Sequence, residues 1–255
     1  PVNMSVHRLW GVISHTYLDC EFEEYLRGII EELGIEIDTF IDSTFAEGLM
    51  LIPEKDAFND AVVVDMGYYH TDVLIVRNSA CIYRTTLPVG GAHLASDVAY
   101  VLQISPSIAE SIKRRHVFGL DYTGRVDTYR LTDGRMESIL YEEVQDVLEA
   151  RAQEMAGMAG ECIRSAPVHV AVDTPVYLCG GGLALMRGSK EVFQSGCGFH
   201  TVVDMPWMPR LNSANFASVY GLLHHVYTHQ LGLSSAGNNW SDNRFIQFLI
   251  NFFTK

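Results

Sequence analysis

Two carboxylates and a glycine stand at a turn between two β-branched runs. Asp65 and Gly67 follow the apolar run 61–64, and Asp72 opens the next run. This pattern predicts a β-hairpin whose Asp-x-Gly corner can place a carboxylate near a phosphate or its metal, and the Gly67 amide near a phosphate oxygen. An ordinary hairpin with turn-forming residues is the alternative, because short motifs often match by chance.

Three consecutive glycines, Gly180, Gly181 and Gly182, follow the short buried strand predicted for residues 176–179. We expect an apolar helix directly after them, so that its first amides and a bare backbone can approach a flat ligand or a phosphate. Close packing of the strand against that helix is the alternative. No lysine follows the glycines, which excludes a P-loop.

Two further pairs combine residue types that can bind ligands. Glu110 and Lys113 lie one helical turn apart, which is typical of a surface ion pair. His225 and His229 could share a helical face toward a metal, but the sequence offers no third ligand. No Ser-His-Asp or Cys-His nucleophile signature is present.

The elements that would position these residues alternate between helices and strands, which predicts an α/β architecture. Asp19 as N-cap and Gly34 as the stop bound the first helix, and Ser105 with Pro106 opens a later one. We expect helices over 19–33, 44–51, 93–102, 105–116, 139–163 and 214–227, and strands over 36–41, 80–87, 176–179 and 200–203. A hairpin that begins at residue 60 is expected to join the run 62–67 to the run 72–76.

The composition of the 255 residues excludes some classes of function. With 48% hydrophobic and 19% charged residues, the chain can bury a substantial core. The formal charge of -13 and the lack of any Lys/Arg run argue against nucleic acid as a partner. Five widely spaced cysteines without a C-x-x-C pair fit a reducing cytosol. The longest apolar runs fall short of the roughly 18 residues that span a bilayer.

The composition changes near the C-terminus. Residues 231–239 are rich in Gly, Ser and Asn and predict a flexible linker. Residues 240–255 then place polar side chains on one narrow helical face, with Ser241 or Asp242 as cap. Docking on the protein's own core is one interpretation, but the linker, the position and the aromatic content favour an in-plane membrane anchor. The residues expected to enter lipid are Trp240, Phe245, Ile246, Phe248, Leu249, Phe252 and Phe253.

Taken in order, several segments resemble FtsA, the family of bacterial actin-like cell-division proteins that tether FtsZ filaments to the membrane. The opening Pro1-Val-Asn-Met-Ser-Val-His-Arg is similar to the family's P-V-G-M-S-G-x-R, and the segment from Asp65 to Asp72 to D-I-G-G-G-T-x-D. Residues 96–100 and 109–116 resemble the S-D-I-A and A-E-x-I-K-x-x-H-G stretches, which we take as the most specific pair. Residues 178–181 resemble L-T-G-G, 220–224 resemble V-G-L-L-H, and the terminal segment resembles the membrane-targeting helix.

The resemblance implies an α/β, actin-like (ribonuclease H-like) ATPase fold, mainly its C-terminal half, with ATP and magnesium as the ligand. It implies that Asp65, Gly67 and Asp72 face the phosphates and the metal. Gly90 and Gly91 would line the cleft, and Gly180, Gly181 and Gly182 would approach the adenosine. Glu110 and Lys113 would reach its ribose or base. Glu149-Ala-Arg151 resembles the family's E-P-R stretch. Arg151 would therefore pair with an acidic residue of the FtsZ C-terminal tail.

The same resemblance implies a domain organisation. Residues 1–59 would be a remnant of the N-terminal half, 60–92 and 166–230 an inner subdomain, 93–165 an outer subdomain with the FtsZ-tail groove, 231–239 the linker, and 240–255 the membrane-targeting helix. The expected location is the cytoplasmic face of the membrane at the division site, as a peripheral protein that also self-associates into filaments.

Two departures from the family bear on nucleotide chemistry. The family's first D-x-G phosphate loop has no counterpart in these residues, and we expect the chain, which opens on Pro1, to be N-terminally truncated. In the second loop Tyr68 and Tyr69 stand where the backbone would approach phosphate oxygens. The hypothesis is therefore a cell-division adaptor with at most weak ATPase activity and no assignable catalytic residue. An active ATPase that drives polymer turnover and a PilM-like pilus-assembly scaffold are the alternatives.

Overall fold

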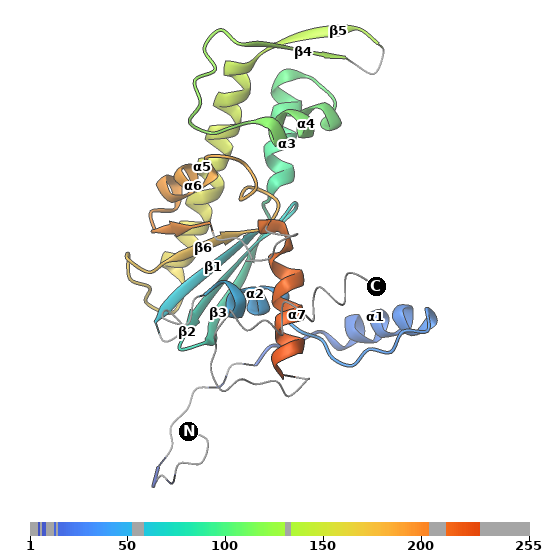
Figure 1. Ribbon diagram of the computed structural model, residues 1–255, viewed down its shortest axis with the longest axis vertical. Coiled ribbons are helices and arrows are strands. Elements are labelled where there is room, and N and C mark those ends of the chain that lie inside the picture. Colours follow the sequence, from blue (N-terminus) through green and yellow to red (C-terminus); the bar gives the residue numbers. More distant parts are fainter. Residues whose placement is uncertain are drawn as a thin grey trace. The chain divides into compact units, whose positions relative to one another are not determined.

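The computed structural model describes residues 5, 7–8, 13, 15–52, 59–130, 134–203 and 213–229, with side chains described up to residue 226. The chain divides into two compact units, Pro1–Asp42 and Ser43–Lys255. Figure 1 labels the elements.

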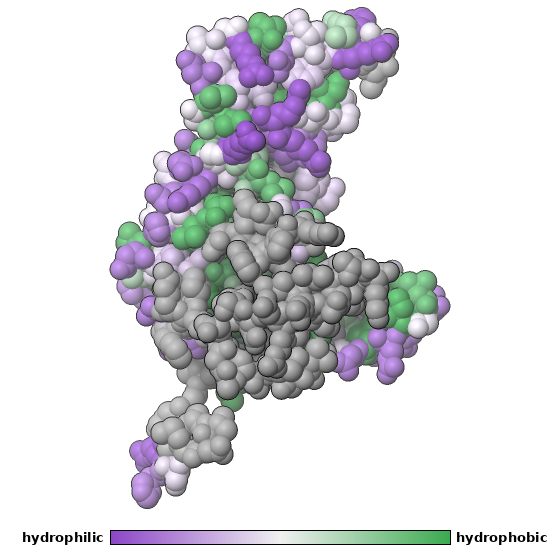
Figure 2. Space-filling view, viewed as in Figure 1, coloured by the Kyte–Doolittle hydropathy of each residue, from purple (hydrophilic) through white to green (hydrophobic). Residues whose placement is uncertain are grey.

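The first unit contains one helix, α1 (Cys20–Glu32), among its described residues. The predicted cap is confirmed, because the Asp19 carboxylate accepts a hydrogen bond of 3.0 Å from the Phe22 amide. Gly34 follows the helix with a left-handed φ of 74°. The apolar stripe of α1 is not buried, and Figure 2 shows its hydrophobic residues at the surface.

The strand predicted for residues 36–41 is wrong, because this segment is irregular. A strand needs a neighbour to satisfy its backbone groups, and no described strand pairs with this one. Instead, the Arg27 guanidinium donates to the Ile37 carbonyl at 3.2 Å and lies over the Phe40 ring.

A five-stranded sheet in the order β3-β2-β1-β6-β7 forms the centre of the second unit. Strands β1, β2 and β3 are antiparallel, whereas β6 and β7 run parallel to β1. Asn78 and Ser79 both have positive φ at the predicted turn, as a tight hairpin requires. The strands are β1 (Asp60–Met66), β2 (Thr71–Arg77), β3 (Ala80–Leu87), β6 (Val176–Cys179) and β7 (Thr201–Val202).

Helices cover both faces of this sheet, so β1 and β2 are buried on both sides (Figure 1). Alternate residues of β1 face opposite layers, since side chains in a strand repeat every two residues. Val62, Val64 and Met66 join the core with α5 (Tyr141–Ser165) and α6 (Ser189–Cys197). Ala61 and Val63 join the core with α2 (Ser43–Leu51) and α7 (Ala217–His229), which the 3-10 helix η2 (Ala214–Phe216) precedes.

The other elements of this unit lie around the N-terminal end of α5, away from the sheet (Figure 1). Helices α3 (Gly91–Leu102) and α4 (Pro106–Arg115) pack together, and the Ser105 hydroxyl caps α4 as predicted. A separate hairpin joins β4 (Val126–Arg130) to β5 (Met136–Leu140), and the surface here mixes hydrophilic and hydrophobic residues (Figure 2).

The other predicted helices and strands are found with boundaries shifted by a few residues. One expectation is wrong: no helix begins directly after the three glycines. Residues 183–188 form bends and turns, with Arg187 in an isolated bridge to Val117. Helix α6 begins only at Ser189, after Gly188 in a left-handed conformation with φ of 76°. Across the described residues, none of the helices has both the length and the apolar character needed to cross a membrane.

Candidate functional site

Three backbone segments meet where β1 and β6 end. We call this site the strand-end corner, and it consists of residues 66–68, 90–92 and 180–182. The Gly91 amide donates to the Gly67 carbonyl at 2.9 Å, and the Gly182 amide donates to the Met66 carbonyl at 2.7 Å. The structure therefore brings together all the glycines that the resemblance assigned to the nucleotide.

Glycine is needed in the corner because the three backbones touch. A side chain on Gly90 would place its Cβ 2.6 Å from the Gly67 carbonyl oxygen, and one on Gly91 would reach the Gly182 Cα at the same distance. A Cβ on Gly182 would overlap the Gly67 carbonyl oxygen. Gly181 is the exception, since it is exposed and a Cβ there would meet only side chains.

The amides that were predicted to approach a ligand are already used inside the chain. Gly67 donates its amide hydrogen to the His70 carbonyl at 2.9 Å, and Gly180 donates to the Ala214 carbonyl at 3.1 Å. Gly180 has φ of 89°, and a Cβ on it would strike the Asp65 carboxylate. Gly180 and Gly182 thus pack closely against the end of β1, and Gly182 also packs against the first residue of α3, not against a helix that follows the glycines.

Asp65 lies beside two groups that the sequence reasoning missed, Glu47 of α2 and Cys179 of β6. One ligand atom from each of the three residues lies within 4.8 Å of the others. The Cys179 thiol donates to the Glu47 carboxylate at 3.5 Å, and Glu47 is only 1% exposed. By geometry these residues could hold a metal ion, but a thiol favours a softer ion than magnesium. The sequence did contain one signal for this cluster, because Glu47 is an acidic residue inside the otherwise apolar segment 44–51.

Burial and mutual repulsion oppose ionisation of this cluster. Burial, reinforced by the nearby Asp65 charge, raises the pKa of Glu47 to about 8. Burial and the Asp72 charge also raise the pKa of Asp65 above its ordinary value. Two carboxyl groups this close cannot easily both ionise, so the pair holds at least one proton at neutral pH.

Asp72 stands opposite Asp65 in the β1–β2 ladder and is 6% exposed. Its carboxylate accepts a hydrogen bond from the Thr86 hydroxyl and one of 3.2 Å from the Arg84 guanidinium. The His70 ring lies 3.6 Å away. The negative charge of Asp72 is therefore compensated by its own strand neighbours.

Lys113 and Glu110 do form the predicted ion pair, but the lysine is buried rather than at the surface. The Lys113 ammonium lies 2.8 Å from the Glu110 carboxylate and donates to the Gly91 carbonyl at 3.0 Å. It also lies 5.4 Å from the centre of the Tyr68 ring. Burial alone would raise the pKa of Glu110, but hydrogen bonds from Lys113 and Arg114 hold it below its ordinary value.

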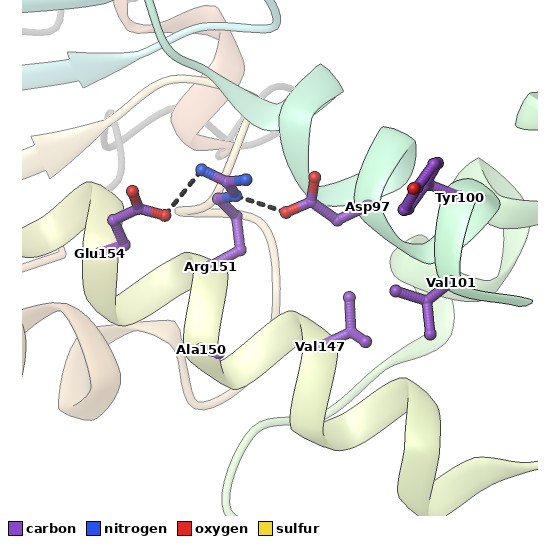
Figure 3. Close-up of a pocket in the computed structure, with 7 residues that line it drawn as sticks. All are labelled: Asp97, Tyr100, Val101, Val147, Ala150, Arg151 and Glu154. Atoms are coloured by element: carbon purple, nitrogen blue, oxygen red, sulfur yellow. Dashed lines mark hydrogen bonds and ion pairs between the residues drawn. The ribbon is translucent and has the colours of Figure 1, made fainter.

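A second candidate site is a groove between α3 and α5, with a volume of about 260 Å³ (Figure 3). The Arg151 guanidinium points into it, donates to Asp97 and pairs with Glu154 at 2.6 Å. Tyr100 and Val101 of α3 are exposed at its edge. The groove is lined by Asp97, Tyr100, Val101, Val147, Ala150, Arg151 and Glu154.

Some sequence predictions fall outside the described residues. These are the linker 231–239, the segment 240–255 with all its predicted lipid-facing side chains, and the side chain of His229. The structure consequently does not test the histidine pair. Within the part of the chain that it describes, the cluster of Glu47, Asp65 and Cys179 is the group of three side chains close enough to share a metal.

Comparison with known proteins identifies the family. The model of "Cell division protein FtsA" matches residues 62–221, which is more than half of the chain. The chain belongs to the FtsA family. The FtsA of Helicobacter pylori strain 26695 is 26% identical over 201 residues, covering 75% of this chain and 40% of the relative. FtsA of Escherichia coli K12 is 22% identical over 196 residues, covering 75% and 47%. This FtsA-family chain thus spans less than half the length of these curated relatives.

Solved structures confirm the fold predicted from the sequence. MreB 5 of Spiroplasma citri bound to AMPPNP superimposes with a TM-score of 0.69 at 18% identity, covering 85% of this chain and 67% of that one. A PilM-PilN type IV pilus biogenesis complex gives 0.55 at 21% identity, covering 78% and 57%. The FtsA-family chain has the actin-like ATPase fold.

Proposed function

We propose that this FtsA-family chain is a cell-division adaptor that anchors FtsZ filaments to the cytoplasmic face of the membrane at the division septum. Its α3–α5 groove would take the C-terminal tail of FtsZ, and residues 240–255 would lie in the lipid interface. The observation that carries the proposal is the groove, which combines a half-buried arginine with exposed apolar side chains.

The groove suits a short peptide that carries both apolar and acidic side chains. Tyr100 and Val101 are 78% and 52% exposed and offer apolar contact area. Asp97 holds the Arg151 guanidinium, while Glu154, whose side chain is 58% exposed, is the partner that a peptide carboxylate can replace. A peptide aspartate or glutamate would then form a charge-assisted pair with an arginine already oriented for it.

The membrane part of the proposal rests on composition. Residues 240–255 are rich in Phe, Ile and Leu and carry Arg244 and Lys255 as their cations, so their lipid binding would come mainly from apolar burial. One such segment binds reversibly, but a filament of many copies multiplies weak anchors into firm attachment. Self-association into filaments is therefore part of the proposed mechanism.

ATP with magnesium is the ligand that the resemblance implies, and two solved structures of similar fold are described as bound to AMPPNP and ADP. The residues of the strand-end corner fit that ligand poorly. Its glycine amides donate to carbonyl groups of the chain, and the neighbours of Asp65 are a second carboxyl group and a thiol. The adaptor function proposed here includes no step that uses ATP.

Replacing Arg151 by glutamate should weaken binding of an FtsZ C-terminal tail peptide by roughly tenfold or more, because an ion pair becomes a repulsion. Fluorescence anisotropy with a labelled peptide measures this affinity. Val101→Glu, which disturbs the groove without touching the arginine, should also weaken binding. Arg114→Glu on α4 is the matched control, since Arg114 is 74% exposed and does not line the groove. Wild-type affinity in both groove variants would exclude the groove as the peptide site.

Removing residues 240–255 should abolish most of the membrane binding, because the apolar area that drives it is lost. Flotation with liposomes of neutral and of anionic lipid compares the intact chain with a chain that ends at Asn239. We expect the intact chain to float with both, since few cations contribute. Equal flotation of the shortened chain would contradict the anchor.

A further inference from the structure

We infer that this chain closes its strand-end corner with its own backbone and side chains, so that the corner keeps its shape without a nucleotide. The inference does not depend on the proposed adaptor function. It concerns the same residues that the resemblance assigned to ATP, and it assigns them a structural task instead.

The first observation is the use of the amide groups. Every predicted glycine of the corner except Gly181 donates its amide hydrogen to another group of the chain: Gly67 to His70, Gly90 to His93, Gly91 to Gly67, Gly180 to Ala214 and Gly182 to Met66. A phosphate held by these glycines would have to replace bonds already made at 2.7–3.1 Å.

The second observation is the position of Tyr68, which follows Gly67 in the hairpin turn. Its backbone carbonyl accepts the Ala92 amide at 2.7 Å, and its ring lies over the Lys113 ammonium. Lys113 in turn bonds the Gly91 carbonyl and pairs with Glu110. Tyr68 and Lys113 thus fasten the turn to the start of α3 from both sides.

The third observation is the saturation of Lys113. An ammonium group has three donors, and the carbonyl, the carboxylate and the ring face occupy three directions around it. The residue is only 3% exposed. A cation that is buried and fully engaged in this way stabilises the corner and has no donor left for a ligand.

The fourth observation is the environment of Asp65. Its neighbours across the sheet and from α2 are Asp72 and Glu47, together with the Cys179 thiol. Magnesium prefers an octahedron of oxygens and waters, and it rarely takes a thiol. A polyphosphate with its metal would bring more negative charge to a place where the chain already keeps carboxyl groups close together.

Hydrogen exchange of the full 255-residue chain, with and without ATP and magnesium, tests the inference. Because the chain spans less than half the length of its relatives, weak ATP binding alone would not discriminate. The exchange rates of the Gly91, Ala92 and Gly182 amides would discriminate between a corner closed by the chain itself and one closed by nucleotide. We expect them to exchange slowly without nucleotide and at the same rate with it.

Two variants make the test specific. Tyr68→Ala should speed exchange at Gly91 and Ala92 by roughly fivefold, the loss expected for a cation–π contact between a buried ammonium and a ring that is 45% exposed. Tyr69→Ala is the matched control, because this ring is 71% exposed and meets the Tyr68 ring edge-to-face, whereas the Lys113 ammonium lies over Tyr68. Fast exchange without nucleotide, slowing on addition of ATP, or no effect of Tyr68→Ala would each overturn the inference. The affinity for FtsZ tail peptide should stay unchanged in Tyr68→Ala, which separates this test from that of the adaptor function.

Discussion

Replacing Gly182 by alanine should lower the free energy of unfolding by roughly 3 kcal/mol, the upper end of what overpacking a well-filled site costs. The new methyl group would overlap the carbonyl oxygens of Met66 and Gly67, and backbone atoms cannot rotate away as a side chain can. The Gly182 amide also bonds Met66, so moving apart would break that bond. Denaturant unfolding followed by circular dichroism measures the change.

Gly181→Ala is the control for this experiment. The two glycines are neighbours with the same intrinsic flexibility, but Gly181 is exposed and a Cβ there would lie 3.4 Å from the Asn215 side chain, an ordinary contact. We expect Gly181→Ala to change stability by less than about 0.5 kcal/mol. Similar losses in both variants would show that backbone flexibility, and not the meeting of three backbones, makes glycine necessary here.

Signals that act within a few residues predicted local structure well. Asp19 and the Ser105-Pro106 pair set the starts of α1 and α4, because a side-chain oxygen satisfies amides that the first turn leaves free. Asn78 and Ser79 set the β2–β3 turn, where both residues need positive φ. These contacts span two to three positions, and the sequence displays them directly.

Features that depend on distant partners were the ones missed. The segment 36–41 has strand-forming residues but no described strand beside it, and propensity alone does not form a ladder. Glu47 is separated from Cys179 by 132 positions, so only the folded sheet reveals that they share a hydrogen bond. The three glycines 180–182 were predicted to let a ligand, or a helix that follows them, come close to the backbone. The segments that meet them, at residues 66–67 and 91, could not be identified from the sequence.

The two candidate sites differ in how far the chain completes them. In the groove, Arg151 is oriented by Asp97 while exposed apolar side chains remain without cover, which is the arrangement of a surface that still has contacts to make. In the strand-end corner, the donors and the cation already have partners within the chain. This contrast is the reason why the adaptor proposal places partner binding in the groove and not in the strand-end corner.

Acidification should destabilise the outer elements through His116, by up to about 3 kcal/mol between pH 6.5 and 4. The ring is 1% exposed and packs beside the rings of Tyr122 and Tyr141, which also contact each other. The centre of the Phe118 ring lies 4.8 Å away. Neither ring nitrogen has a hydrogen-bond partner among the described residues. Burial therefore disfavours the charged form and lowers the pKa from 6.5 to about 4.

The sign follows from which state takes up the proton first. The unfolded chain binds it near pH 6.5 and the folded chain only near pH 4, so His116 contributes its full stability above pH 6.5 and loses it as the pH falls between these values. The expected loss of about 3 kcal/mol is the difference between the unfolded and folded pKa values of His116, multiplied by 1.36 kcal/mol per pKa unit. Unfolding of wild type and His116→Phe across this range isolates the effect, because other groups titrate equally in both. The variant should be more stable than wild type, increasingly so toward pH 4. Parallel stability curves would mean that the ring is protonated, or reached by water, in the folded state.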